Sequence, residues 1–155
     1  MATTYSFVTD WSFEAPIHDV WHAISDICSY PEIWPDFKKV QVRVGDGRSV
    51  GSIIDAETRG RLPYSLNYSL EVVESVEPRH ILLKSAGDLV GSGRWELSPL
   101  GDSRTAVKYY WDVATTNPVL NFLAPLFRSA LARNHDEVMA RGRAAFARVL
   151  TGARQ

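Results

Sequence analysis

Several features that define large classes of protein are scarce or missing in this chain. Cys28 is the only cysteine among 155 residues, so no intramolecular disulfide can form, which suits a reducing compartment. The formal net charge is −1, with 17 basic and 18 acidic residues, so no basic excess points to nucleic acid or to an anionic membrane. No window approaches the roughly 18 consecutive apolar residues of a membrane span, and the first ten residues do not resemble a signal peptide. We therefore expect a cytoplasmic protein with no nucleic-acid partner and no membrane insertion.

Motifs for common cofactors, metals and nucleophiles are also missing. The segment from Gly87 to Gly93 lacks the spacing and the strand–helix context of a dinucleotide-binding loop. No GxSxG nucleophile elbow is present. His18 and His22 stand four residues apart, a spacing that suits a metal, but no acid or cysteine completes the set. We predict no metal and no cofactor.

The chain is rich in short alternating apolar segments. Its length corresponds to one domain, which we place over residues 1–155. Alternation and turn signals predict seven strands joined by short links, which require antiparallel pairing. The predicted strands are Tyr5–Phe13, Val40–Val44, Ser52–Arg59, Tyr64–Val72, Ile81–Ser85, Val90–Leu97 and Val107–Val113. Pro16 opens a short helix after the first strand, and Asp26 can cap a second that runs toward Trp34.

The last third, from about residue 117, is predicted to be helical. Pro118 suits a first helical position, and Pro125 should break or kink this opening piece. Beyond it, an apolar stripe at helical spacing predicts a long helix over Leu126–Leu150. Residues 151–155 are expected to form a loose tail.

Together these elements predict an α+β helix-grip fold. A single amphipathic helix covers one face of a seven-stranded antiparallel sheet only if the sheet curves around it. Because a helix is only about 10–12 Å across, one end of the grip tends to stay unfilled. The inferred inner face carries large aromatic residues, which would either line a small-molecule pocket or simply fill the core. These residues are Tyr64, Tyr68, Trp95, Tyr109 and Trp111.

Three glycines within predicted elements indicate close packing. Gly91 and Gly93 lie inside a strand, where glycine marks a bulge or the close approach of another backbone. Gly142 lies inside the long helix at a cost of about 1 kcal/mol relative to alanine. We expect the helix and the sheet to cross closely there.

The chain resembles the SRPBCC or START-like superfamily, near the branch of polyketide cyclases and dehydrases. The similarity rests on Trp11–Pro16, on Val20-Trp21 and Ile24–Asp26, on Tyr30-Pro31 with Trp34-Pro35, on Gly91–Trp95 with Val107–Val113, and on Asn134–Met139 followed by Gly142. One subgroup has an aromatic residue before that asparagine, where this chain has Arg133. The resemblance implies a helix-grip fold. Members include cyclases, aromatases, lipid carriers and hormone receptors, so it does not specify the chemistry.

His135 is the candidate catalytic residue. A histidine can exchange protons near neutral pH and serve as a general base, or donate a hydrogen bond to a ligand carbonyl. Its helical spacing relative to Met139 and Gly142 places His135 on the side of the helix that faces the sheet. The alternative to a catalytic role is a structural one, in which His135 ties the helix to the sheet. Strand parity places Arg94 opposite Trp95 and therefore outward.

We expect the chain to bind a small hydrophobic or aromatic molecule between the sheet and the C-terminal helix. A polyketide cyclase, dehydratase or aromatase is the enzymatic version. The alternatives are a lipid or small-molecule carrier, and an interaction or regulatory module with a vestigial cavity. Ligand contacts are predicted at Trp34, Arg59, Tyr64, Tyr68, Trp95, Tyr109, Trp111, Asn134 and Val138. The sequence does not distinguish a monomer from a dimer.

Overall fold

A computed structural model describes residues 3–60, 62 and 64–153, and contains the predicted sheet and helices. The strands are β1 (Thr3–Phe13), β2 (Phe37–Val44), β3 (Ile53–Thr58), β4 (Leu66–Val76), β5 (His80–Gly87), β6 (Leu89–Pro99) and β7 (Thr105–Thr115). The helices are α1 (Ile17–Ser25), the 3-10 turn η1 (Ile27–Ser29), α2 (Tyr30–Ile33) and α3 (Pro118–Ala153). The predicted α+β class and the seven strands are confirmed.

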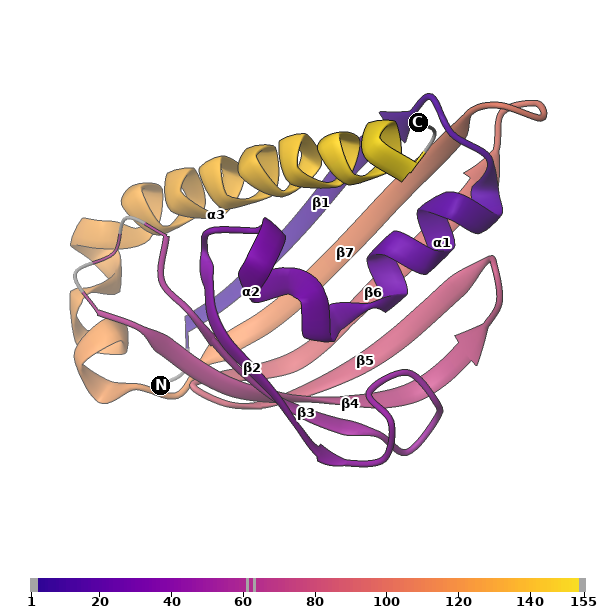
Figure 1. Ribbon diagram of the computed structural model, residues 1–155. Helices are drawn as coiled ribbons and strands as arrows, with labels where there is room; N and C mark the ends of the chain where they lie inside the picture. The colour runs from indigo at the N-terminus through magenta and orange to yellow at the C-terminus, as the bar shows by residue number, and fades with distance from the viewer. Residues whose placement is uncertain (1–2, 61, 63, 154–155) are drawn as a thin grey trace.

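The strands form one antiparallel sheet that curves around α3. Their order is β1-β7-β6-β5-β4-β3-β2, so among the described strands β1 and β7 are the only neighbours that are not consecutive in sequence. Figure 1 shows α3 running across the open side of the sheet, with α1 and α2 beside it over the same face. Because β1 pairs with β7, the first and the last strand contribute one continuous wall, in which Phe7 lies opposite Trp111.

Alternation along the strands directs aromatic side chains to the concave face. In β1, Tyr5, Trp11 and Phe13 are buried, whereas Ser6 and Asp10 on the other face are exposed. Arg94 is exposed, which confirms its predicted outward direction, and it forms an ion pair with Glu96. These positions follow from the two-residue period of a strand.

The core under the C-terminal half of α3 is built around Phe146. This ring is fully buried, and its centroid lies 5.5–5.8 Å from the rings of Trp11, Tyr30 and Trp34. Edge-on and tilted aromatic pairs at this separation are favourable beyond the area they bury. Phe146 therefore joins α3 to both the sheet and the α2 segment.

Helix α3 begins at Pro118, where the sequence predicts a first helical position, but it ends later than predicted. The helix continues through Pro125, so of the predicted break or kink only the kink occurs (Figure 1). The helix bends there, because proline lacks the N–H that would bond to the carbonyl of Asn121; Figure 1 shows the bend between the first turns and the long remainder. Helix α3 also extends to Ala153, three residues into the predicted loose tail, while residues 154–155 lie outside the described residues.

The close contact at Gly142 is with a tryptophan rather than with the sheet. A Cβ at Gly142 would lie 2.4 Å from the Trp34 indole, so the predicted helix–sheet crossing there is wrong. Trp34 directly follows α2, and its Nε1 donates to the Val138 carbonyl at 3.0 Å. At Gly91 the predicted backbone approach is confirmed, since a Cβ would lie 2.0 Å from the Asp112 carbonyl oxygen of β7.

A second fastening joins the same segment to α3. Asp36 is buried and accepts hydrogen bonds from the Arg141 guanidinium, with Nη2–Oδ1 at 2.7 Å and Nε–Oδ2 at 2.9 Å. Paired bonds between a guanidinium and a carboxylate define orientation as well as distance. The Asp36 backbone carbonyl also accepts from the N–H of Arg59, next to β3. Trp34 and Asp36 thus hold α3 over the strands that border the cavity described next.

Candidate functional site: an aromatic cavity under the C-terminal helix

A cavity lies between the concave face of the sheet and the middle of α3. Its volume is about 1070 Å³ when the open mouth is included. Side chains from all seven strands, from α3 and from the segment around α2 line it. Mostly apolar walls with a few polar groups are typical of cavities that hold small molecules. None of the described helices is both long and apolar enough to span a bilayer.

One wall of the cavity is a stack of aromatic rings on β6 and β7. Trp95 and Tyr109 stack with their centroids 4.1 Å apart, and Tyr109 and Trp111 are nearly parallel at 6.0 Å. Gly93 makes room for them, because a Cβ there would lie 2.9 Å from the Trp111 ring and 3.0 Å from the Tyr109 hydroxyl. The missing side chain therefore permits a flat aromatic surface.

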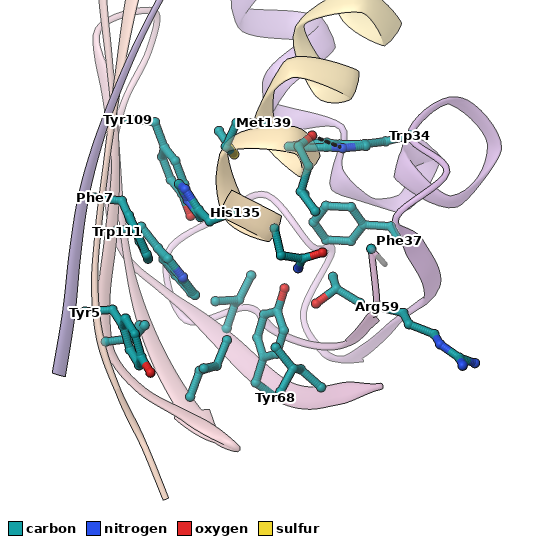
Figure 2. A pocket seen from close by; sticks show the side chains of 18 of the residues that line it. Tyr5, Phe7, Trp34, Phe37, Arg59, Tyr68, Tyr109, Trp111, His135 and Met139 are labelled. Carbon is teal, nitrogen blue, oxygen red and sulfur yellow. Dashed lines mark hydrogen bonds between the residues drawn. The ribbon is translucent and has the colours of Figure 1, made fainter. Parts of the chain in front are cut away.

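A second series of rings follows β1 and ends on the helix. Tyr5 and Phe7 are nearly parallel at 6.1 Å, and Phe7 stacks on the His135 imidazole at 3.9 Å with an angle of 10°. His135 therefore faces the sheet, as its helical spacing predicted. Figure 2 shows Tyr5, Phe7 and Trp111 on the sheet side, with His135 and Met139 projecting from the helix above them.

The two ring nitrogens of His135 are buried and have no hydrogen-bond partner among the described residues. Both ring nitrogens are inaccessible to solvent. The nearest charged group is the Asp136 carboxylate, 3.8 Å from Nδ1, which is too long for a hydrogen bond. Burial lowers the pKa of His135 and outweighs the opposing effect of Asp136. The imidazole is therefore neutral at pH 7, with one nitrogen able to accept and the other to donate.

Two phenols add polar groups to the apolar walls. Burial raises the pKa of Tyr68 to about 12, although a hydrogen bond with Thr58 opposes that shift. Burial also raises the pKa of Tyr109 well above its usual value, and the neighbouring phenols of Tyr68 and Tyr30 reinforce the effect. Both hydroxyls therefore remain protonated at neutral pH and can donate to a ligand oxygen.

Eight of the nine predicted ligand contacts line the cavity. These are Trp34, Arg59, Tyr68, Trp95, Tyr109, Trp111, Asn134 and Val138, and the predicted catalytic residue His135 lies with them. Tyr64 is not among the lining residues. In Figure 2 the Arg59 guanidinium points away from the cavity. Its Nε donates a hydrogen bond to the Leu62 carbonyl at 2.9 Å. The ligand-binding and catalytic roles remain predictions.

The turn after β3 contacts α3 at one of these predicted positions. Gly60 has a φ of +63°, and a Cβ there would lie 2.6 Å from the Asn134 side-chain oxygen and 2.9 Å from Val138. Glycine suits this position because it tolerates positive φ and leaves room for the asparagine amide. The turn and the helix therefore meet at the border of the cavity.

Sequence reasoning missed Tyr5, Phe7, Phe37 and Met139 as lining residues. Tyr5 and Phe7 alternate along the first strand on the same face as Trp11 and Phe13, so the alternation signal is present in the sequence. The missing information was that β1 pairs with β7, which brings these rings beside Trp111. Pairing between strands a hundred residues apart leaves no local signal in one sequence.

The described residues contain no group of three or more His, Cys, Asp or Glu side chains arranged to hold a metal. His18 and His22, the pair with metal-compatible spacing, are both exposed on α1. The ionisable group of interest in the cavity is thus the neutral His135.

The lowered pKa of His135 predicts a pH-dependent stability. Below about pH 6.5 the unfolded chain binds a proton at this position that the folded chain resists. The free energy of unfolding should therefore fall as the pH drops from 7.5 to 5.5, by at most about 1.4 kcal/mol per pH unit for one proton. In His135→Phe, which keeps a ring against Phe7, this part of the slope should vanish. Urea unfolding at both pH values measures it; identical slopes in the two proteins would contradict a buried neutral imidazole.

The fold and the cavity define a helix-grip protein with an internal, mostly apolar cavity between sheet and helix. A profile of the family described as "Polyketide cyclase / dehydrase and lipid transport" matches residues 13–139, and the chain belongs to this family. This confirms the resemblance seen in the sequence, and it supports a fold that binds hydrophobic ligands. No curated protein sequence matches the chain at a significant level.

Solved structures share the fold at low sequence identity. The Zhui aromatase/cyclase from Streptomyces sp. R1128 is 16% identical, with a TM-score of 0.80 over 99% of this chain and 97% of that one. A START superfamily protein from Mycobacterium smegmatis is 19% identical, with a TM-score of 0.74 over 96% and 98%. A norcoclaurine synthase point mutant from Thalictrum flavum is 16% identical, with a TM-score of 0.65 over 100% and 99%. At these identities the likeness establishes the fold alone.

Proposed function

We propose that this protein binds a flat aromatic or polyketide-like molecule in the cavity and uses His135 to move a proton on it. The observation that carries the proposal is the neutral imidazole, buried in an apolar cavity with neither ring nitrogen hydrogen-bonded among the described residues. A buried polar group without a partner costs stability, so such a group in a ligand-sized cavity suggests a role in the bound state. The similarity of the fold to an aromatase/cyclase supports the same class of substrate.

The arrangement is suited to an aldol-type cyclisation. The aromatic walls would hold a polyketone chain folded, so that orientation supplies much of the rate. The neutral His135 would take a proton from a carbon beside a carbonyl, and the resulting enolate would form a carbon–carbon bond to a second carbonyl. The protonated imidazole would then return its proton to the new alkoxide. Tyr68 and Tyr109, both protonated, would donate to carbonyl oxygens during these steps.

A carrier without catalysis is the second candidate, because the family description also names lipid transport and the cavity walls are mostly apolar. An interaction module with a vestigial cavity is disfavoured, since its own side chains would fill the space. The two favoured functions differ in the part played by His135. A carrier would keep its ligand when His135 is replaced, and an enzyme would lose turnover on its substrate in His135→Ala.

Binding can be tested by isothermal titration calorimetry with 2-naphthol, a flat apolar phenol. We expect one site per chain, and at least a tenfold weaker affinity in Leu66→Trp, because Leu66 lines the cavity and a larger ring would occupy it. Val73→Trp, on the exposed side of the same strand, is the matched control and should bind like the wild type. Native mass spectrometry of the freshly purified protein would identify a lipophilic molecule that co-purifies. Failure of the wild type to bind 2-naphthol, with no co-purifying molecule, would refute the proposed function.

A further inference from the structure

A second polar group in the cavity is buried and unpartnered, at some distance from His135. Tyr5 projects from β1, is 7% exposed and lines the cavity. Its hydroxyl is inaccessible to solvent and has no hydrogen-bond partner among the described residues. Among the described residues, the buried side-chain polar atoms without a hydrogen-bond partner are this oxygen and the two ring nitrogens of His135. All of them belong to residues that line one cavity.

The Phe7 ring separates these two groups. Its centroid lies 6.1 Å from that of Tyr5 and 3.9 Å from that of His135, and the three rings are nearly parallel. Figure 2 shows the three side chains in succession along the sheet side of the cavity, with Tyr5 at the corner opposite Trp34. Tyr5 and His135 thus lie on opposite sides of an apolar ring, so a ligand that reaches both groups must carry an apolar body between its two polar ends.

The surroundings of Tyr5 explain why its hydroxyl stays neutral and in place. Burial raises its pKa, and the guanidinium of Arg128, 5.5 Å above the ring centroid, opposes that shift without cancelling it. Arg128 also donates to the carbonyl of Thr4 beside it at 3.3 Å. The ring is therefore held between α3 and β1, and its O–H can both donate to and accept from a ligand.

We propose that Tyr5 and His135 are two hydrogen-bonding anchors for one ligand, which carries oxygen groups at both ends of a flat apolar body. This inference rests on the proposed function and deepens it, because it specifies a doubly oxygenated polycyclic ligand rather than any lipophile. An apolar lipid with one polar end would leave one anchor unsatisfied. A ligand with oxygens at both ends satisfies both, and buried polar groups left unpaired discriminate strongly against ligands that lack the partner.

Two probes with the same ring system test this pairing by isothermal titration calorimetry. They are 2,6-dihydroxynaphthalene, with an oxygen at each end, and 2-naphthol, with one. In the wild type we expect the diol to bind about tenfold more tightly, as one additional hydrogen bond would provide. In Tyr5→Phe this preference should collapse to within about twofold, while the affinity for 2-naphthol changes by less than about threefold. His135→Phe should reduce the preference in the same way.

Tyr110→Phe is the matched control. Tyr110 follows Tyr109 on β7, so its side chain faces the side of the sheet away from the cavity. This variant should keep the wild-type preference. Thermal unfolding provides a second readout: Tyr5→Phe should unfold at a temperature no lower than the wild type, since the lost hydroxyl has no partner to lose among the described residues.

The outcomes separate the two proposals. If 2-naphthol binds but Tyr5→Phe keeps the full preference for the diol, the second anchor is wrong and the cavity remains a binding site. The second anchor is also wrong if Tyr110→Phe loses the preference equally. If neither probe binds the wild type, both the proposed function and this inference are overturned.

Discussion

Replacement of Phe146 by alanine is expected to lower the free energy of unfolding by about 3–5 kcal/mol, the usual cost of deleting a buried aromatic ring. Phe146 is fully buried and contacts rings from β1, from α2 and from the residue that follows α2. Its removal would leave a cavity between helix and sheet that rigid neighbouring rings cannot close. Urea unfolding followed by circular dichroism measures the change as a lower midpoint with an unchanged slope.

Phe122→Ala is the matched control for this experiment. Phe122 lies on the same helix but is 84% exposed, so its removal should change the free energy of unfolding by less than about 0.5 kcal/mol. If both variants lost the same stability, or Phe146→Ala lost less than about 1 kcal/mol, the packing of α3 described above would be incorrect.

Gly142→Val should lower the free energy of unfolding by about 2–3 kcal/mol through overpacking. Intrinsic helix propensity works in the opposite direction, since valine is a better helix former than glycine by a few tenths of a kcal/mol. Any loss must therefore come from contact with Trp34, whose indole lies 2.4 Å from the position of a Cβ. That ring is also held by its hydrogen bond to the Val138 carbonyl, so it cannot move aside freely.

Gly152→Val separates propensity from packing. Gly152 lies in the last turn of the same helix with nothing within 4 Å of a Cβ, so its replacement should leave stability unchanged or slightly increase it. Because Trp34 lines the cavity, Gly142→Val should also weaken the binding of 2-naphthol. A stable Gly142→Val variant would show that the helix and Trp34 are less tightly packed than the structure indicates.

The parts of the fold that local patterns encode were predictable. Alternation in Val107–Val113 and helical spacing after Pro125 result from short-range geometry, so a single sequence contains the signal. Element ends were less predictable: α3 starts at the predicted Pro118, but it continues as one helix through Pro125 and reaches Ala153, beyond the predicted end at Leu150. The partner of Gly142 was also wrong, since the sequence indicates that space is needed there but not which side chain fills it.

The features of the candidate site also fall into those that local sequence patterns encode and those that they do not. The sequence alone determined that a curved sheet would carry inward aromatic rings beneath a long helix, and that His135 would face that sheet, because each of these depends only on periodicity and length. Only the tertiary structure decided that Tyr5 and Phe7 join His135 along one wall and that Tyr64 does not line the cavity. The reason is the pairing of β1 with β7: contacts between residues so distant in the chain depend on the order in which all the strands assemble into the sheet, and no local segment encodes that order.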